Sequence, residues 1–148
     1  MHNLEQKLKN FIENFIPNED KSQEIEFFIE NKNTKYVDHI MVKAIEQVRL
    51  SVITGNAGYG KTTAIKRFIK NRPEAIFIKA NNLFTTKDFL EILCNELNIK
   101  IENRGRQMFE SVINTLSRTN KFIVIDEAEW LKDKTLDMVR NIWEESKT

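Results

Sequence analysis

Two hydrophobic periodicities alternate along most of this 148-residue chain. Three short apolar runs have the length and the β-branched or aromatic content of buried strands, and they lie at 50–54, 75–78 and 122–125. Apolar residues recur every three or four positions elsewhere, which predicts amphipathic helices over about 61–71, 86–97, 106–118 and 131–145. Thr86 is the predicted cap of the second of these helices. Strands that alternate with helices favour an α/β fold, with a parallel sheet flanked by helices.

The first 35 residues follow a different pattern. Helical spacing predicts one helix over 3–16 that stops before Pro17, and a second short helix over 20–31. A polar hinge follows, after which Asp38 is predicted to cap a third helix. We therefore divide the chain into a helical N-terminal segment, 1–35, and a main α/β domain, 36–148.

Composition is ordinary for a globular protein, with 41% hydrophobic and 30% charged residues. The net charge of +1 gives no overall basic footprint, so any nucleic-acid binding must come from a local patch. A single cysteine fits a reducing compartment. The apolar runs are too short to span a bilayer, and the N-terminus lacks the features of a signal peptide. We expect a cytoplasmic protein with no membrane partner.

A glycine-rich loop carries the first chemical motif. The run Gly55-Asn56-Ala57-Gly58-Tyr59-Gly60-Lys61-Thr62 matches the pattern G-x-x-x-x-G-K-[ST] in full. Glycines let the backbone wrap a phosphate, and the helix that follows adds its positive N-terminal end. Lys61 can reach the β- and γ-phosphates, and the Thr62 hydroxyl can ligate Mg²⁺. We predict an ATP site formed by these eight residues and Thr63.

A second motif closes the third predicted strand. Its apolar run ends in Asp126, which places a carboxylate at the carboxyl edge of the sheet, where it can hold Mg²⁺. Glu127 can deprotonate a water that attacks the γ-phosphate, as an ATPase requires. The predicted catalytic residues are therefore Glu127 and Lys61, and the predicted metal ligands are Thr62 and Asp126.

Other conspicuous side chains have plainer interpretations. Cys94 lies on the apolar side of its helix and is predicted to be a core residue. Trp130 and Trp143 are predicted to be packing residues, although Trp130 is placed where it could cover the active edge. Arg104 and Arg106 are expected in solvent, with contact to a DNA backbone or a neighbouring subunit as the alternative.

With both motifs in place, the chain resembles the AAA+ ATPases, and within them the Mu-type and Tn7-like helper ATPases of DNA transposition. The similar stretches, besides the glycine-rich loop, are Tyr36-Val37-Asp38, Ile125-Asp126-Glu127-Ala128-Glu129-Trp130-Leu131 and the helix at 136–146. The resemblance implies an ATP hydrolase with ATP and Mg²⁺ as cofactors. It also implies double-stranded DNA binding without strong sequence preference, assembly into filaments or rings, target capture and stimulation of a transposase.

Two features depart from that group. Residues 1–35 supply only short, slightly acidic helices where the Mu-type protein has a helix-turn-helix domain, which favours a hairpin that packs on the ATPase or a partner. The strand order of the group, 5-1-4-3-2, places one more strand between those at 50–54 and 122–125, and the sequence stops before that strand. We therefore expect the N-terminal part of an AAA+ core without its sensor and lid, with little or no ATP hydrolysis of its own.

Two other functions stay open at this point. One is a different DNA-associated AAA+ loader or initiator. The other is a truncated interaction protein that binds nucleotide without turnover. Transport ATPases of the ABC type are disfavoured because the sequence has no L-S-G-G-Q-like signature.

Overall fold

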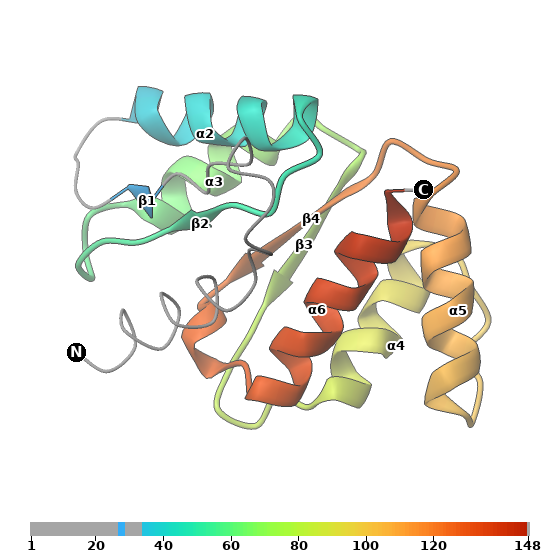
Figure 1. Cartoon of the computed structure of the whole chain (residues 1–148). Helices are drawn as coiled ribbons and strands as arrows, with labels where there is room; N and C mark the ends of the chain where they lie inside the picture. Colours follow the sequence, from blue (N-terminus) through green and yellow to red (C-terminus); the bar gives the residue numbers. More distant parts are fainter. Residues whose placement is uncertain (1–26, 29–33, 148) are drawn as a thin grey trace, which may run out of the picture. The chain divides into compact units, whose positions relative to one another are not determined.

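A computed structural model of the chain describes residues 27–28 and 34–147 (Figure 1). The chain divides into two compact units, and the boundary lies between Phe68 and Ile69. Each unit contains one two-stranded parallel sheet. None of the helices in the described part is long and apolar enough to cross a membrane.

In the first unit, β1 (Phe27–Phe28) pairs in parallel with β2 (Val52–Ile53). Its helices are α2 (Thr34–Glu46) and α3 (Lys61–Ile69). The buried side chains of α2 recur at helical spacing and are Val37, Ile40 and Met41. An ion pair joins the two helices, because Nη2 of Arg67 donates to both carboxylate oxygens of Asp38 at 2.6 Å.

Two expectations for this unit are wrong. Phe27 and Phe28 lie in a strand, although their spacing predicted a helix over 20–31. Pairing with β2 gives their backbone groups a hydrogen-bond ladder between segments, which local spacing does not reveal. Asp38 does not cap α2, which begins four residues earlier at Thr34. The predicted helix over 3–16 and the rest of 20–31 lie outside the described residues.

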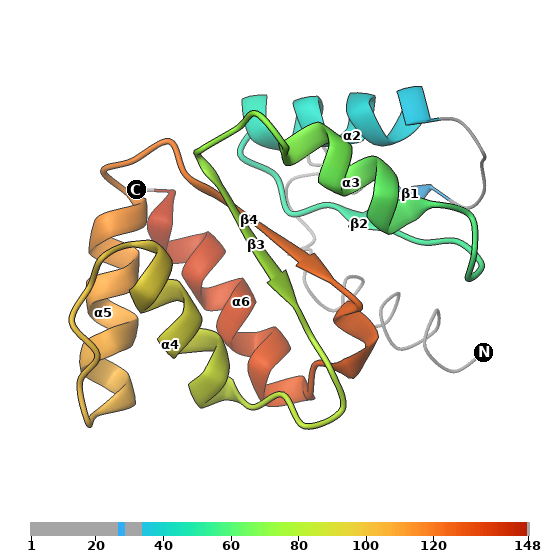
Figure 2. The ribbon, with the colours of Figure 1, turned by 180° about the vertical axis from the view of Figure 1, so that it is seen from behind.

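In the second unit, β3 (Ala75–Lys79) pairs in parallel with β4 (Phe122–Asp126). Three helices lie together on one face of this pair (Figures 1 and 2): α4 (Thr86–Glu96), α5 (Gly105–Leu116) and α6 (Asp133–Ser146). Ile76 and Ile78 point into that layer and are almost fully buried. Their register partners, Ile123 and Ile125, pack against the same core.

The parallel pairing of β3 with β4 confirms the predicted α/β class. It is also the adjacency that the strand order 5-1-4-3-2 gives to its second and third strands. The core under the helices includes the Cys94 side chain, which is fully buried, as predicted. Burial raises the pKa of the Cys94 thiol, with a smaller contribution from the charge of Glu91.

The cap of α4 is Thr85 and not the predicted Thr86. The Thr85 hydroxyl accepts from the Asp88 backbone N–H at 3.2 Å, and the Asp88 carboxylate accepts from the Thr85 backbone N–H at 2.8 Å. This reciprocal arrangement is a capping box. The Thr85 hydroxyl also donates to Asp88, and together with the backbone donor it lowers the pKa of the Asp88 carboxyl.

Thr86 is not the cap of α4, and its side chain instead links two helices of the core. Its hydroxyl lies 2.9 Å from the hydroxyl of Thr135, near the start of α6. Thr135 is fully buried, so its hydroxyl depends on Thr86 for a hydrogen bond inside the helical layer.

Thr86→Val should lower the free energy of unfolding by about 1–3 kcal/mol, because it leaves the fully buried Thr135 hydroxyl without its partner. Chemical denaturation of both single variants and the double variant tests this. We expect Thr86→Val with Thr135→Val to cost clearly less than the sum of the single changes. Additive losses would show that the two hydroxyls do not depend on each other.

Candidate functional site

The glycine-rich loop connects β2 to α3 and has a backbone that requires glycine at two positions. Gly58 has φ of 84° and Gly60 has φ of 76°, in the left-handed region. Nothing lies within 4 Å of the point where a Cβ would be at either residue. Conformation, and not lack of space, therefore explains these two glycines.

Lys61, the first residue of α3, folds back over this loop. Its ammonium donates to the carbonyl oxygens of Gly55 at 2.5 Å and Asn56 at 2.9 Å. A Cβ on Gly55 would lie 3.7 Å from Cδ of Lys61, so the lysine stem lies directly across that glycine. The loop thus brings a cation to the N-terminus of a helix, where backbone N–H groups lack acceptors within the helix. This donor set fits a polyphosphate.

The other predicted residues of the loop lie in the same continuous segment. Thr62 is half-buried in the first turn of α3, and Thr63 is exposed beside it. Tyr59 is exposed, and its ring edge lies 4.0 Å from the point where a Cβ on Gly55 would be. Asn56 and Ala57 are exposed at the turn. The assignment of residues 55–63 to ATP stays a prediction.

The acidic motif lies in the second unit, where β4 ends. Asp126 is its last residue and is buried, and its backbone oxygen accepts from the Ala80 N–H at 3.0 Å. Glu127 adopts φ of 55° and ψ of 40°, a left-handed conformation that is rare outside glycine and asparagine. The Trp130 N–H donates to the Glu127 carbonyl at 3.0 Å, which closes the short helix η1 (Ala128–Trp130). The chain therefore reverses sharply straight after the buried carboxylate.

An ion pair holds the Glu127 carboxylate, and its partner was not predicted from the sequence. Nζ of Lys79 lies 3.2 Å from Oε1 of Glu127. Lys79 ends β3 and stands in register with Asp126. Both side chains are substantially exposed, so the pair adds little to stability and mainly orients the carboxylate. The only sequence signal was a charged residue at the end of an apolar strand.

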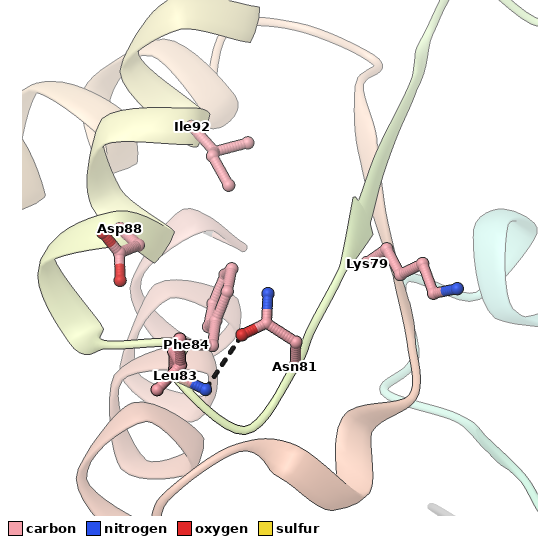
Figure 3. A pocket seen from close by; sticks show the side chains of 6 residues that line it. All are labelled: Lys79, Asn81, Leu83, Phe84, Asp88 and Ile92. Carbon is pink, nitrogen blue, oxygen red and sulfur yellow. Dashed lines mark hydrogen bonds between the residues drawn. The ribbon is translucent and has the colours of Figure 1, made fainter.

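A shallow hollow of about 360 Å³ lies beside Lys79, at the carboxyl end of β3. Lys79 extends away from the apolar wall that Phe84 and Ile92 form (Figure 3). The Asn81 side-chain oxygen accepts from the Leu83 N–H at 2.9 Å, and Asp88 is engaged in its capping box. These polar groups are engaged in hydrogen bonds within the loop and at the start of α4, so they do not provide the hollow with a ligand-binding group.

The other side chains singled out in the sequence have different outcomes. Trp130 is not a packing residue: 47% of it is exposed, because η1 carries it away from the helical layer. Trp143 is partly buried, and Nζ of Lys147 lies 3.1 Å from its ring centroid. Arg106 is exposed and pairs with Glu110 at 2.8 Å, one helical turn along α5.

The glycine-rich loop belongs to the first unit and the acidic motif to the second. Each motif is formed by residues of its own unit. The sequence profile of a family described as AAA domain matches residues 45–148, which include both motifs. The chain belongs to the AAA-domain family. No curated protein matches the chain.

Membership of the AAA family makes this chain a nucleotide-binding P-loop ATPase domain. ATP and Mg²⁺ are the general cofactors of such ATPases. The predicted ligands Thr62 and Asp126 carry a hydroxyl and a carboxylate, which are hard oxygen donors of the kind that Mg²⁺ accepts, and their assignment stays a prediction. The chemistry of these donors therefore fits the metal.

Lys61→Ala should weaken ATP binding sharply while the fold survives, because the loop amides alone leave the phosphate charge uncompensated. Binding of a fluorescent ATP analogue measures the effect. Lys66→Ala, an exposed lysine later in α3, is the matched control and should bind like the parent. Equal affinity of the Lys61 variant and the parent would contradict this role.

Glu127→Gly should be more stable than Glu127→Gln by about 1 kcal/mol. Glycine adopts the left-handed conformation without the steric cost of roughly 1–2 kcal/mol that a side chain meets there. Both variants lose the ion pair with Lys79, so the difference isolates the backbone strain. Thermal and denaturant unfolding of the two variants give the comparison, and equal stabilities would show that Glu127 is not strained.

Proposed function

We propose that this domain is a Mg²⁺-dependent ATPase that assists DNA transposition in the cytoplasm. In this role it binds double-stranded DNA without strong sequence preference, self-associates into a filament or ring, captures target DNA and stimulates a transposase. The ATPase part is carried by one observation: an AAA match that spans both a lysine-bearing glycine loop and a strand-end carboxylate pair.

The residues divide the chemistry between them. Lys61 offsets charge on the β- and γ-phosphates, and Thr62 with Asp126 would hold the metal ion. Mg²⁺, when bound, neutralises phosphate charge and orients the γ-phosphate. Glu127 accepts the proton of the attacking water, and Lys79 orients the Glu127 carboxylate by their ion pair.

Support for the transposition role comes from sequence similarity in the second unit. The run from Ile125 to Leu131 and the helix at 136–146 resemble the corresponding stretches of the transposition helper ATPases. In the structure, the first run forms the strand end, the left-handed turn and η1, and the second lies in α6. The similarity thus includes the segment that positions the proposed catalytic base.

ATP-dependent co-sedimentation with duplex DNA tests the proposal, followed by strand-transfer assays with a purified transposase. We expect ATP to promote DNA binding and the complex to stimulate strand transfer. DNA binding that loads a replication factor but never stimulates a transposase would overturn the transposition role. Nucleotide binding without DNA binding would overturn the proposed role on DNA.

In protein with measurable turnover, Glu127→Gln should keep ATP affinity and lose about 10²- to 10⁴-fold in hydrolysis rate, because an amide cannot accept the proton of the water. Phosphate release under saturating ATP measures the rate. Glu129→Gln, an exposed glutamate two residues further on, is the control and should hydrolyse ATP like the parent. An unchanged rate in the Glu127 variant would show that another group is the base.

A further inference from the structure

Two side chains that follow Gly55 in the chain border the same side of that glycine. A Cβ on Gly55 would lie 3.7 Å from Cδ of Lys61 and 4.0 Å from its Nζ. The same point lies 4.0 Å from Cδ2 of Tyr59. These are ordinary van der Waals separations, so the lysine stem and the edge of the tyrosine ring border one small space over the glycine.

A shared hydrogen-bond acceptor also brings Tyr59 and Lys61 together. The Asn56 carbonyl accepts from the Tyr59 backbone N–H at 3.4 Å, which closes a turn over residues 56–59. The same carbonyl accepts from the Lys61 ammonium at 2.9 Å. The turn therefore folds Tyr59 back toward the place where Lys61 is bound.

The Lys61 ammonium keeps a donor for a ligand in this position. An ammonium group has three N–H donors, and the carbonyls of Gly55 and Asn56 take two of them. The third can reach a phosphate oxygen while the other two bonds remain. The ammonium is therefore already placed for a polyphosphate, provided that the long lysine stem stays over the loop.

A lysine stem does not stay in one place without confinement. It is a flexible chain of four carbons, and ordering such a side chain when a ligand binds lowers the affinity. Lys61 is nevertheless half-buried, although the neighbouring loop residues 56–60 are exposed. With the glycine on one side and the Tyr59 ring edge beside it, part of this ordering precedes the ligand.

We propose that Tyr59 is a positioning residue for Lys61, whose ring confines the lysine stem over Gly55 and so holds the ammonium ready for the β- and γ-phosphates. The inference rests on the proposed binding of ATP by this loop. Tyr59 acts through the lysine, by its ring edge and without its hydroxyl. Because 40% of Tyr59 is exposed, its replacement removes little core packing.

Two other roles for Tyr59 make different demands on its side chain. A tyrosine that binds the nucleotide directly uses its hydroxyl on a phosphate or its ring on the base. A tyrosine that only packs supports the loop and leaves Lys61 as it was. Tyr59→Ala removes both the ring and the hydroxyl, and Tyr59→Phe returns the ring edge alone.

The first measurement follows Lys61 in the full chain without nucleotide. Acetylation by an activated ester requires the free amine, so its rate at Lys61 follows the fraction released from the two carbonyls, and peptide mass spectrometry gives that rate. Tyr59→Ala should raise it by about 2- to 10-fold, the factor that corresponds to ordering one long side chain. Tyr59→Phe should restore the rate of the parent. The rate at Lys134, which is exposed in the second unit, is the internal control and should be equal in all three proteins.

The second measurement compares ATP with inorganic triphosphate, which has no base or sugar. Tyr59→Ala should weaken the binding of both ligands by about the same 2- to 10-fold, because Lys61 meets only the phosphates. Tyr59→Phe should recover the affinity. Ile101→Ala removes a similarly exposed apolar side chain from the second unit and is the matched control, which should bind like the parent. Competition against a fluorescent ATP analogue gives the affinities, and thermal unfolding of each variant shows that the fold is kept.

Each other outcome overturns the inference in a distinguishable way. Unchanged acetylation of Lys61 in Tyr59→Ala would show that the ring does not confine the stem, and a lower unfolding temperature with it would show a packing role. Weaker ATP binding by Tyr59→Phe would show a direct bond from the hydroxyl. A loss for ATP without a loss for triphosphate would show a contact with the base, and tighter ATP binding by Tyr59→Ala would show that the confined ammonium hinders the ligand. If the parent binds neither ligand, the proposed ATP site fails, and the acetylation rates still report whether Tyr59 confines Lys61.

Discussion

The parallel pairing of β3 with β4 is the interaction on which the second unit depends. Its register sets Ile76 beside Ile123 and Ile78 beside Ile125, which makes one apolar face for three helices to cover. The same register places Lys79 beside Asp126 at the carboxyl end. Hydrophobic burial and the placement of charged groups therefore follow from a single pairing. A shift of one residue would turn the isoleucines away from the helices.

The segments proposed to act on nucleotide depart from ordinary local preferences, as Val48 and Asn98 do elsewhere in the chain. Gly58 and Gly60 hold the loop in left-handed conformations, and Glu127 adopts such a conformation with a side chain attached. A residue of this kind persists only where the surrounding structure over-determines it. Here the surroundings are the end of a buried strand on one side and the hydrogen bond that closes η1 on the other.

Charge is organised differently in the two units. Among the described residues of the second unit, ion pairs mostly join near neighbours in the sequence, as between Arg106 and Glu110, while the pair of Lys79 with Glu127 joins the ends of two strands. In the described part of the first unit, an ion pair joins two helices, from Arg67 on α3 to Asp38 on α2.

The sequence by itself determined the motifs and most of the elements, because both depend on neighbours along the chain. The glycine loop, the strand before Asp126 and the helices around Phe89 and Val112 follow from spacing that short segments carry. The helix starts were less certain: Thr85 and Thr86 are both of the residue type that caps helices, and in the structure Thr85 caps α4 through its reciprocal bonds with Asp88 while Thr86 contacts Thr135. Tertiary structure alone decided the pairing of Phe27 and Phe28 with β2, the bond from Asp38 to Arg67 and the contact of Lys79 with Glu127. Each of these joins residues far apart in the chain, and the free energy that selects them comes from register and packing, which no local pattern contains.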